Sequence, residues 1–158
     1  MEHPQNTEPV TPETRSGTLT VHGLRELLDA GSEVEVPMRG GSMSPWLRAG
    51  DRLRLRPARE VRLGDVLLVV HESRGLVHRM IGRQGDAVLT RGDSVKRADP
   101  PSRDGQIVAR VHTAWRGSRR LRWGFGPERV PLAILSRHGW LYPILKRLRQ
   151  WKAWWKAR

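Results

Sequence analysis

The sequence predicts a compact, mainly β domain with a short helix before it and a basic amphipathic helix at its C-terminal end. The length of 158 residues is that of one domain. Short segments of alternating apolar and polar residues fill the middle of the chain. From residue 116 onward the chain carries 12 basic residues and one acidic residue, which is +11 of the net charge of +13. We expect a disordered leader at 1–17, a β domain with its opening helix at 18–123, and a basic tail at 124–158.

The elements follow in order from these patterns. The leader is polar, contains prolines and shows no hydrophobic period, which is typical of disorder. Residues 18–30 place apolar side chains at helical spacing, and Gly31 is a suitable stop, so we expect a helix there. After it the period changes to two, and Gly-Asp or similar turn signals separate the apolar segments. Strands are expected at 34–38, 52–56, 66–70, 76–81, 87–90 and 107–112.

The C-terminal tail has the pattern of a helix that lies on a membrane surface. Pro143 is a natural first helical residue. At 100° per residue, six apolar residues fall within about 120° of arc. A helix of 16 residues spans about 24 Å, which is too short to cross a bilayer, while Trp beside Lys and Arg suits an anionic interface. We therefore expect residues 137–158 to bind anionic lipid. The apolar stripe consists of Leu141, Ile144, Leu145, Leu148, Trp151 and Trp155.

Two other uses of the tail stay open at this point. The apolar stripe of the helix is also suited to packing on the β domain. Stacking aromatic side chains among cations would also serve a single-stranded nucleic acid, although we do not expect nucleic acid as the partner. The position of the stripe relative to the β domain distinguishes these alternatives.

Composition excludes several classes of protein. No apolar run approaches the roughly 20 residues of a membrane-spanning helix. The N-terminal segment lacks the basic and apolar parts of a secretory signal, so we expect a cytoplasmic protein that is peripheral at the membrane. The sequence has no Cys, which excludes a disulfide framework, a thiol nucleophile and a thiolate metal site. Its six His occur singly, without the spacing of a zinc site, so we expect neither metal nor cofactor.

One loop of the predicted β domain carries a candidate nucleophile. The chain runs Gly40-Gly41-Ser42-Met43-Ser44-Pro45, and Gly50-Asp51 follows shortly after. A serine between a flexible Gly pair and a turn can expose its hydroxyl, and neighbouring backbone N–H groups can point at a developing oxyanion. Gly-Ser pairs are also common in ordinary turns, so this loop alone leaves both interpretations open.

The order of the motifs after this loop resembles a known family, the signal peptidase I and LexA-type serine peptidases. The resemblance covers residues 34–112, about half of the chain. The strand that carries the basic residue has His before Arg here, as in the endoplasmic-reticulum and archaeal type, in which His replaces Lys as the general base. The matching motifs are Gly-Ser-Met-x-Pro at 41–45, Gly64-Asp65-Val66, His78-Arg79, Gly92-Asp93 and Asp99.

The resemblance implies the roles of the site residues. Ser42 would attack the scissile carbonyl, and neutral His78 would take its proton and pass it to the leaving amine. Either Asp99 or Asp93 would orient the imidazole. Many signal peptidases carry a Ser where this chain has Gly40, which leaves only backbone donors for the oxyanion. No metal is needed.

A second histidine competes for the role of base. His71 ends its predicted strand beside Glu72, and it occupies no position of the family's motifs. An isolated His in a strand is often structural, and this holds for His78 as well when its context is left out.

The function that these features predict is that of a Ser/His endopeptidase, which removes a leader, signal or pro-segment from a protein or peptide. Two alternatives come from other classes. One is a self-cleaving regulator like the LexA repressors, for which Ala30-Gly31 is the upstream candidate bond, although the first 30 residues are too few for a helix-turn-helix unit. The other is a non-catalytic basic binding module on the same scaffold, whose activity would survive loss of Ser42.

Overall fold

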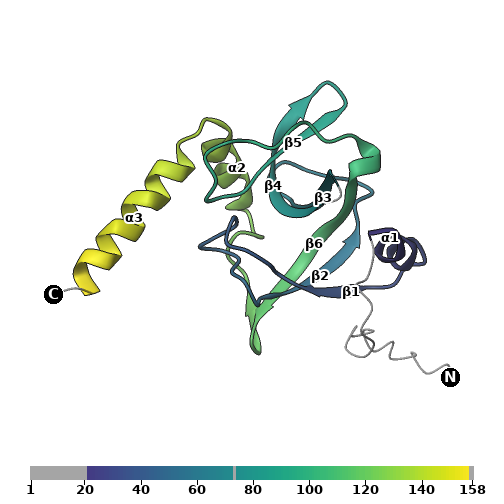
Figure 1. The fold of residues 1–158 in the computed structure, drawn as a ribbon, viewed down its shortest axis with the longest axis horizontal. Helices are drawn as coiled ribbons and strands as arrows, with labels where there is room; N and C mark the ends of the chain where they lie inside the picture. The colour runs from purple at the N-terminus through teal and green to yellow at the C-terminus, as the bar shows by residue number, and fades with distance from the viewer. Residues whose placement is uncertain (1–20, 73, 157–158) are drawn as a thin grey trace.

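The computed structural model describes residues 21–72 and 74–156, and within them the protein is mainly β (Figure 1). This confirms the predicted fold class. The leader at 1–17 and the first residues of the expected helix lie outside the described residues. The helices are α1 (Val21–Asp29), α2 (Arg129–Arg137) and α3 (Leu141–Lys156), with a 3₁₀ turn η1 (Asp104–Gln106). The strands are β1 (Val34–Pro37), β2 (Arg52–Pro57), β3 (Val66–His71), β4 (Arg74–Gln84), β5 (Ala87–Arg91), β6 (Ile107–Arg116) and β7 (Arg119–Leu121).

All strand pairs of the sheet are antiparallel, and the strand order is β1-β2-β6-β3-β4-β5, with β7 paired to β6. The late strand β6 lies between β2 and β3, and the sheet curls around its own core (Figure 1). Each segment expected to be a strand is one. Strands β4 and β6 extend beyond the expected 76–81 and 107–112, because both are paired on two sides and their polar ends join the ladder as well.

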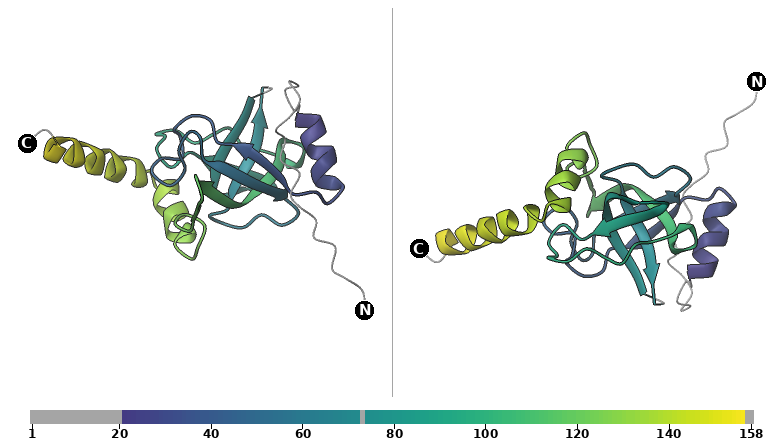
Figure 2. Two further views of the ribbon diagram at one scale, coloured as in Figure 1. Left: turned by 90° about the horizontal axis from the view of Figure 1, so that it is seen from below. Right: turned by 90° about the horizontal axis from the view of Figure 1, so that it is seen from above.

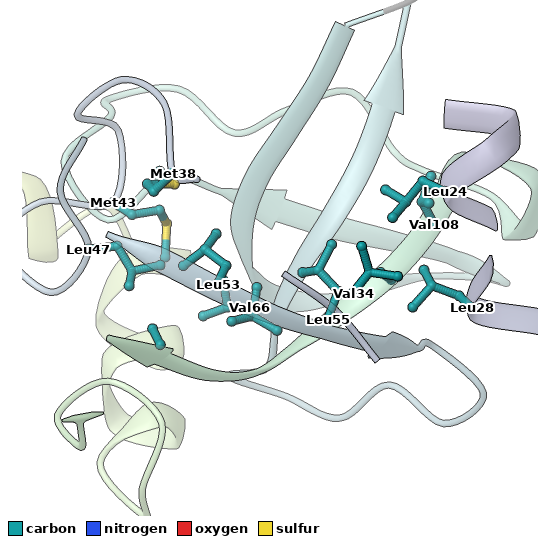
Figure 3. Close-up of a cluster of buried hydrophobic side chains, with 13 residues drawn as sticks. Leu24, Leu28, Val34, Met38, Met43, Leu47, Leu53, Leu55, Val66 and Val108 are labelled. Atoms are coloured by element: carbon teal, nitrogen blue, oxygen red, sulfur yellow. The ribbon is translucent and has the colours of Figure 1, made fainter. Parts of the chain in front are cut away.

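The hydrophobic core anchors the loop that carries Ser42 at one end of the sheet. Leu24 and Leu28 of α1 cover one end of the main apolar cluster. At the other end lie Met43 and Leu47, from the loop between β1 and β2 (Figure 3). Both side chains are fully buried, and burying such a side chain is worth about 1.5–3 kcal/mol. The loop that carries Ser42 is therefore anchored on the core rather than free to move.

The C-terminal segment differs from the expected single tail. Helix α2, which the sequence analysis did not place, packs on β4 and buries Ala133 and Ser136. Its residues Val130 to Leu135 form one of the longest apolar runs of the chain, but a run of that length has no period that separates helix from strand. Helix α3 begins two residues before Pro143 and contacts α2. Figures 1 and 2 show α3 extending away from the sheet, on the side opposite α1.

None of the helices within the described residues is long and apolar enough to cross a membrane.

Candidate active site

The Ser42 loop is a series of tight turns between two buried anchors. Met43 directly follows Ser42 and Leu47 ends the turn, and the Leu47 N–H donates to the Met43 carbonyl at 3.1 Å. The Ser44 N–H donates to the Gly41 carbonyl, also at 3.1 Å. The peptide bond between Ser44 and Pro45 is cis. These contacts leave Ser42 partly exposed on a backbone of defined conformation.

Asp51, which is buried, closes the loop by an ion pair with the partly exposed Arg116. The Asp51 carboxylate accepts hydrogen bonds from Arg116 Nε and Nη2, each at 2.8 Å, and from the Arg48 N–H at 2.8 Å. Burial by itself raises the pKa of Asp51, but these hydrogen bonds outweigh it and hold the pKa below its usual value. The same Arg116 Nη2 donates to the Trp46 carbonyl at 3.2 Å. The Gly-Asp motif therefore stabilises this turn, and the ion pair of its Asp connects the loop to β6.

The Ser42 loop docks on the segment after β5. The Ser94 N–H donates to the Ser42 carbonyl at 2.8 Å, and the Ser94 hydroxyl donates to the Gly41 carbonyl at 2.8 Å. Gly92 allows this close approach: a Cβ there would lie 2.8 Å from the Ser42 carbonyl oxygen and 2.9 Å from Ser42 Cβ. Any larger residue at position 92 would push the Ser42 loop away.

His78 is held by a carboxylate from a distant part of the chain. Its Nδ1 lies 2.6 Å from Asp99 Oδ2, and the same oxygen accepts a hydrogen bond from Thr90 Oγ1 at 2.6 Å. The Asp99 N–H donates to the Thr90 carbonyl at 2.9 Å, which places the carboxylate beside β5. Both side chains are largely buried, with 6% of His78 and 10% of Asp99 exposed. With Nδ1 engaged, Nε2 is the nitrogen of His78 left for a reacting group.

The strand register brings His78 and Ser42 to the same end of the hairpin. Arg79 on β4 is paired with Arg91 on β5, so the next residues along the two strands are His78 and Gly92. Gly92 is the residue on which Ser42 packs. In the part of the chain that the structure describes, no hydrogen bond joins the Ser42 hydroxyl to His78. The register and the surroundings of Gly92 place the Ser42 loop at the end of β5, where the pairing with β4 begins next to His78.

The second candidate acid, Asp93, contacts Arg79 instead of His78. Asp93 Oδ1 accepts from Arg79 Nε at 2.8 Å and Oδ2 accepts from Nη2 at 2.7 Å, and both side chains are fully buried. Arg79 Nη1 donates to the carbonyls of Gly64 and Gly124, at 2.9 and 2.8 Å. Asp93 therefore anchors a buried cation that joins three segments, and Asp99 is the acid beside the imidazole.

The rival base His71 lies elsewhere. It is paired with Arg74 at the far end of the β3–β4 hairpin, whereas His78 is paired with Leu67 near the start of β3. Four residues of strand span about 13 Å. His71 Nε2 lies 3.0 Å from the Ser102 hydroxyl, which is a structural contact. The geometry does not bring His71 to Ser42.

Backbone donors are available beside Ser42. Within the described residues, the N–H groups of Ser42 and Met43 donate to no acceptor. An N–H adjacent to the nucleophile is well placed to stabilise an oxyanion, and Gly40 offers no side chain for that purpose. The site thus has backbone donors where many members of the resembled family also have a hydroxyl.

Three contributors to the site were not predicted from the sequence: Thr90, which shares the Asp99 oxygen, Ser94, which holds the nucleophile loop, and Arg79 as the common anchor. Two of them carried a signal, because Arg79 belongs to the His78-Arg79 motif and Ser94 directly follows Gly92-Asp93. Thr90 is an ordinary strand residue by sequence, so its partner could not be inferred.

A separate cationic cleft of about 620 Å³ lies between β6, β7 and the segment 122–126. Neither Ser42, His78 nor Asp99 lines it. Partial desolvation lowers the pKa of His112, which remains exposed at this cleft, and the positive charges of Arg56, Arg110 and Arg120 lower it further against the opposing effect of Glu33. The basic residues that line the cleft are Arg62, Arg110, His112, Arg120, Arg122 and Arg129.

Comparison with models of known protein families finds no match to this chain, and comparison with the curated proteins finds none either. The chemistry of the site is therefore argued from its own geometry. Across residues 21–72 and 74–156, no group of three or more His, Asp or Glu side chains is arranged as a metal site.

Proposed function

We propose that the protein is a serine endopeptidase that uses Ser42 as nucleophile and His78 as general base. The observation that carries this proposal is the His78–Asp99 contact of 2.6 Å at the strand end that packs, through Gly92, against Ser42. The Asp99 carboxylate contacts Nδ1 of His78, and the Ser42 loop lies at the same end of the hairpin. A catalytic Ser-His-Asp arrangement requires both features.

The chemistry follows from the contacts of these three residues. Neutral His78 accepts the Ser42 proton at Nε2 as Oγ attacks the scissile carbonyl, and a tetrahedral intermediate forms. Unpaired N–H groups of the Ser42 loop stabilise its oxyanion. The imidazolium then donates its proton to the leaving amine, and water repeats the sequence on the acyl-enzyme. Asp99 keeps the proton of the neutral ring on Nδ1 and stabilises the positive charge of the imidazolium.

The arrangement of the chain favours cleavage of another molecule over self-cleavage. The candidate self-cleavage bond, between Ala30 and Gly31, follows α1. Leu28 of α1 lies at the end of the core opposite Met43 and the Ser42 loop (Figure 3). That bond cannot reach Ser42 without unpacking α1. The substrate proposed is therefore a leader, signal or pro-segment of another protein or peptide.

The proposal is tested with a peptide library prepared from a cell proteome, in which mass spectrometry identifies the new ends. The wild-type protein should cut a defined set of sites, and Ser42→Ala should lower the rate by about 10³-fold or more. Asp99→Asn should lower it by about 10²–10⁴-fold, because the ring loses the partner that selects its tautomer.

Matched controls keep the interpretation specific. Ser44→Ala changes a neighbouring hydroxyl in the same loop and should keep most of the activity, and His71→Ala should do the same. Equal cleavage by the wild type and Ser42→Ala would exclude Ser42 as the nucleophile. Loss of activity in His71→Ala with full activity in His78→Ala would show that the base is misassigned.

If the protein instead binds its partner without cleaving it, no library peptide should be cut by the wild type. Binding partners captured with the wild type and with Ser42→Ala would then be identical. That outcome would support the non-catalytic binding module on the same scaffold.

A further inference from the structure

Helix α3 contacts α2 near its beginning. Leu141 and Leu145, one turn apart, are 3% and 6% exposed and lie on the side of α3 that contacts α2. From there the helix continues away from the sheet, and views from two opposite sides agree on this (Figure 2). At 1.5 Å per residue the 16 residues of α3 span about 24 Å. Most of its length therefore has no domain surface to pack on.

The projecting part of α3 presents large apolar side chains outside the core. Ile144, Leu148 and Trp151 are spaced by four and three residues, which places them on one side of the helix. They are 45%, 49% and 58% exposed, and Trp140 just before the helix is 62% exposed. Single exposed apolar residues are common, but a row of them along one projecting helix indicates an interaction surface. The side chains of 152–158, including Trp155 of the expected stripe, lie outside what the structure describes.

The charge around this row identifies the chemistry of the partner. Exposed Lys146, Arg147 and Arg149 flank it, and the last acidic residue of the whole chain is Glu128, before α2. Each cation near an anionic membrane surface contributes about 1 kcal/mol. Trp residues are enriched where an apolar interior meets a charged interface. Apolar insertion and positive charge thus occur on the same helix.

We propose that α3 is a membrane-docking helix that holds the domain reversibly on an anionic lipid surface. A second copy of the chain is a poor occupant, because two such helices bring together cations without any acidic residue to pair with. The β domain is not the occupant, since α3 contacts α2 and then projects away from the sheet (Figure 2). The proposal does not depend on the peptidase activity, and its failure would leave the Ser42 site untouched.

The experiment measures co-sedimentation of the full chain with large unilamellar vesicles. One set is phosphatidylcholine alone, and the other contains about one third phosphatidylglycerol. The wild-type protein should bind the anionic vesicles at least tenfold more tightly than the neutral ones. Raising NaCl to about 0.5 M should weaken the binding, because the Debye length then falls to a few ångströms.

Two variants separate the contributions of the helix. The double variant Leu148→Ser/Trp151→Ser removes two of the three apolar side chains of the row. The double variant Lys146→Glu/Arg147→Glu reverses two of the flanking positive charges. Each should weaken vesicle binding at least tenfold. All four positions are exposed, so far-ultraviolet circular dichroism and the thermal midpoint should match the wild type. Trp123→Ala is the matched control, since Trp123 is 69% exposed but lies outside α3, and it should bind as the wild type does.

Several outcomes would overturn the proposal. These are equal binding to the two kinds of vesicle, no binding by the wild type, or equal loss in Trp123→Ala and Leu148→Ser/Trp151→Ser. Tighter binding of a single-stranded oligo-dT that displaces the vesicles would assign the helix to nucleic acid instead. A concentration-dependent dimer that Leu148→Ser/Trp151→Ser abolishes would assign it to a second copy.

Discussion

Replacement of Asp93 by Asn removes the carboxylate that pairs with the buried Arg79. Both side chains are fully buried, and two hydrogen bonds of 2.8 and 2.7 Å join them. The asparagine side chain would keep the shape of the aspartate but turn one acceptor into a donor that faces an Arg N–H. Breaking a buried ion pair on one side costs about 3–5 kcal/mol, because the remaining charge has no compensation.

That cost is large relative to the stability of a domain of this size. The free energy of unfolding of a domain is about 5–15 kcal/mol, so Asp93→Asn would remove about a fifth or more of it. With a urea slope of about 1.5 kcal/mol per molar, the unfolding midpoint should fall by about 2–3 M. Urea titrations followed by tryptophan fluorescence measure this shift directly.

Glu60→Gln is the matched control for this experiment. It also removes one charge from an Arg–carboxylate pair, but the side chains of Arg62 and Glu60 are 68% and 80% exposed. Exposed pairs contribute little, so the change in the free energy of unfolding should stay within about 0.5 kcal/mol. An Asp93→Asn midpoint within about 0.5 M of the wild type would refute the reasoning that Asp93 compensates a buried charge.

Two further predictions concern backbone space and protonation. Gly64→Ala should lower the free energy of unfolding by about 1–3 kcal/mol more than Gly31→Ala does. Both glycines have positive φ, but of the two only Gly64 has a neighbour that a Cβ would meet, the Arg129 carbonyl oxygen at 2.5 Å. Equal losses in thermal or urea unfolding would contradict this. The NMR titration midpoint of His112 should lie below 6.5, mainly because of partial desolvation, and Arg56→Gln should raise it. Because the folded pKa is lowered, the stability that His112 contributes is present above about pH 6.5 and is lost as the pH falls through the folded pKa; a midpoint at or above 6.5 would be inconsistent with this environment.

The local patterns of the chain were sufficient for β1 to β6 but not for β7, and the candidate nucleophile was chosen by the order of the motifs. Alternation at Val34–Met38 and at Leu53–Leu55 predicted β1 and β2, because one face of each strand must meet the core. The Gly-Ser-Met motif indicated Ser42, and the apolar Met43 and Leu47 that anchor its loop are visible in the sequence. The short helix before the sheet was likewise predicted from its period, and α1 lies within the predicted range.

The sequence by itself determined where β1 to β6 and the opening helix form and that the C-terminal segment is strongly basic, since these depend on neighbouring residues, and the order of its motifs indicated the candidate Ser and His. Only the tertiary structure decided that Asp99, 21 residues from His78, contacts its ring while Asp93 is taken by Arg79. It also decided that α2 packs on β4 and that Ile144 and Leu148 of α3 are about half exposed. The physical reason is that such contacts depend on strand pairing and side-chain direction between distant segments, and no short-range period encodes them.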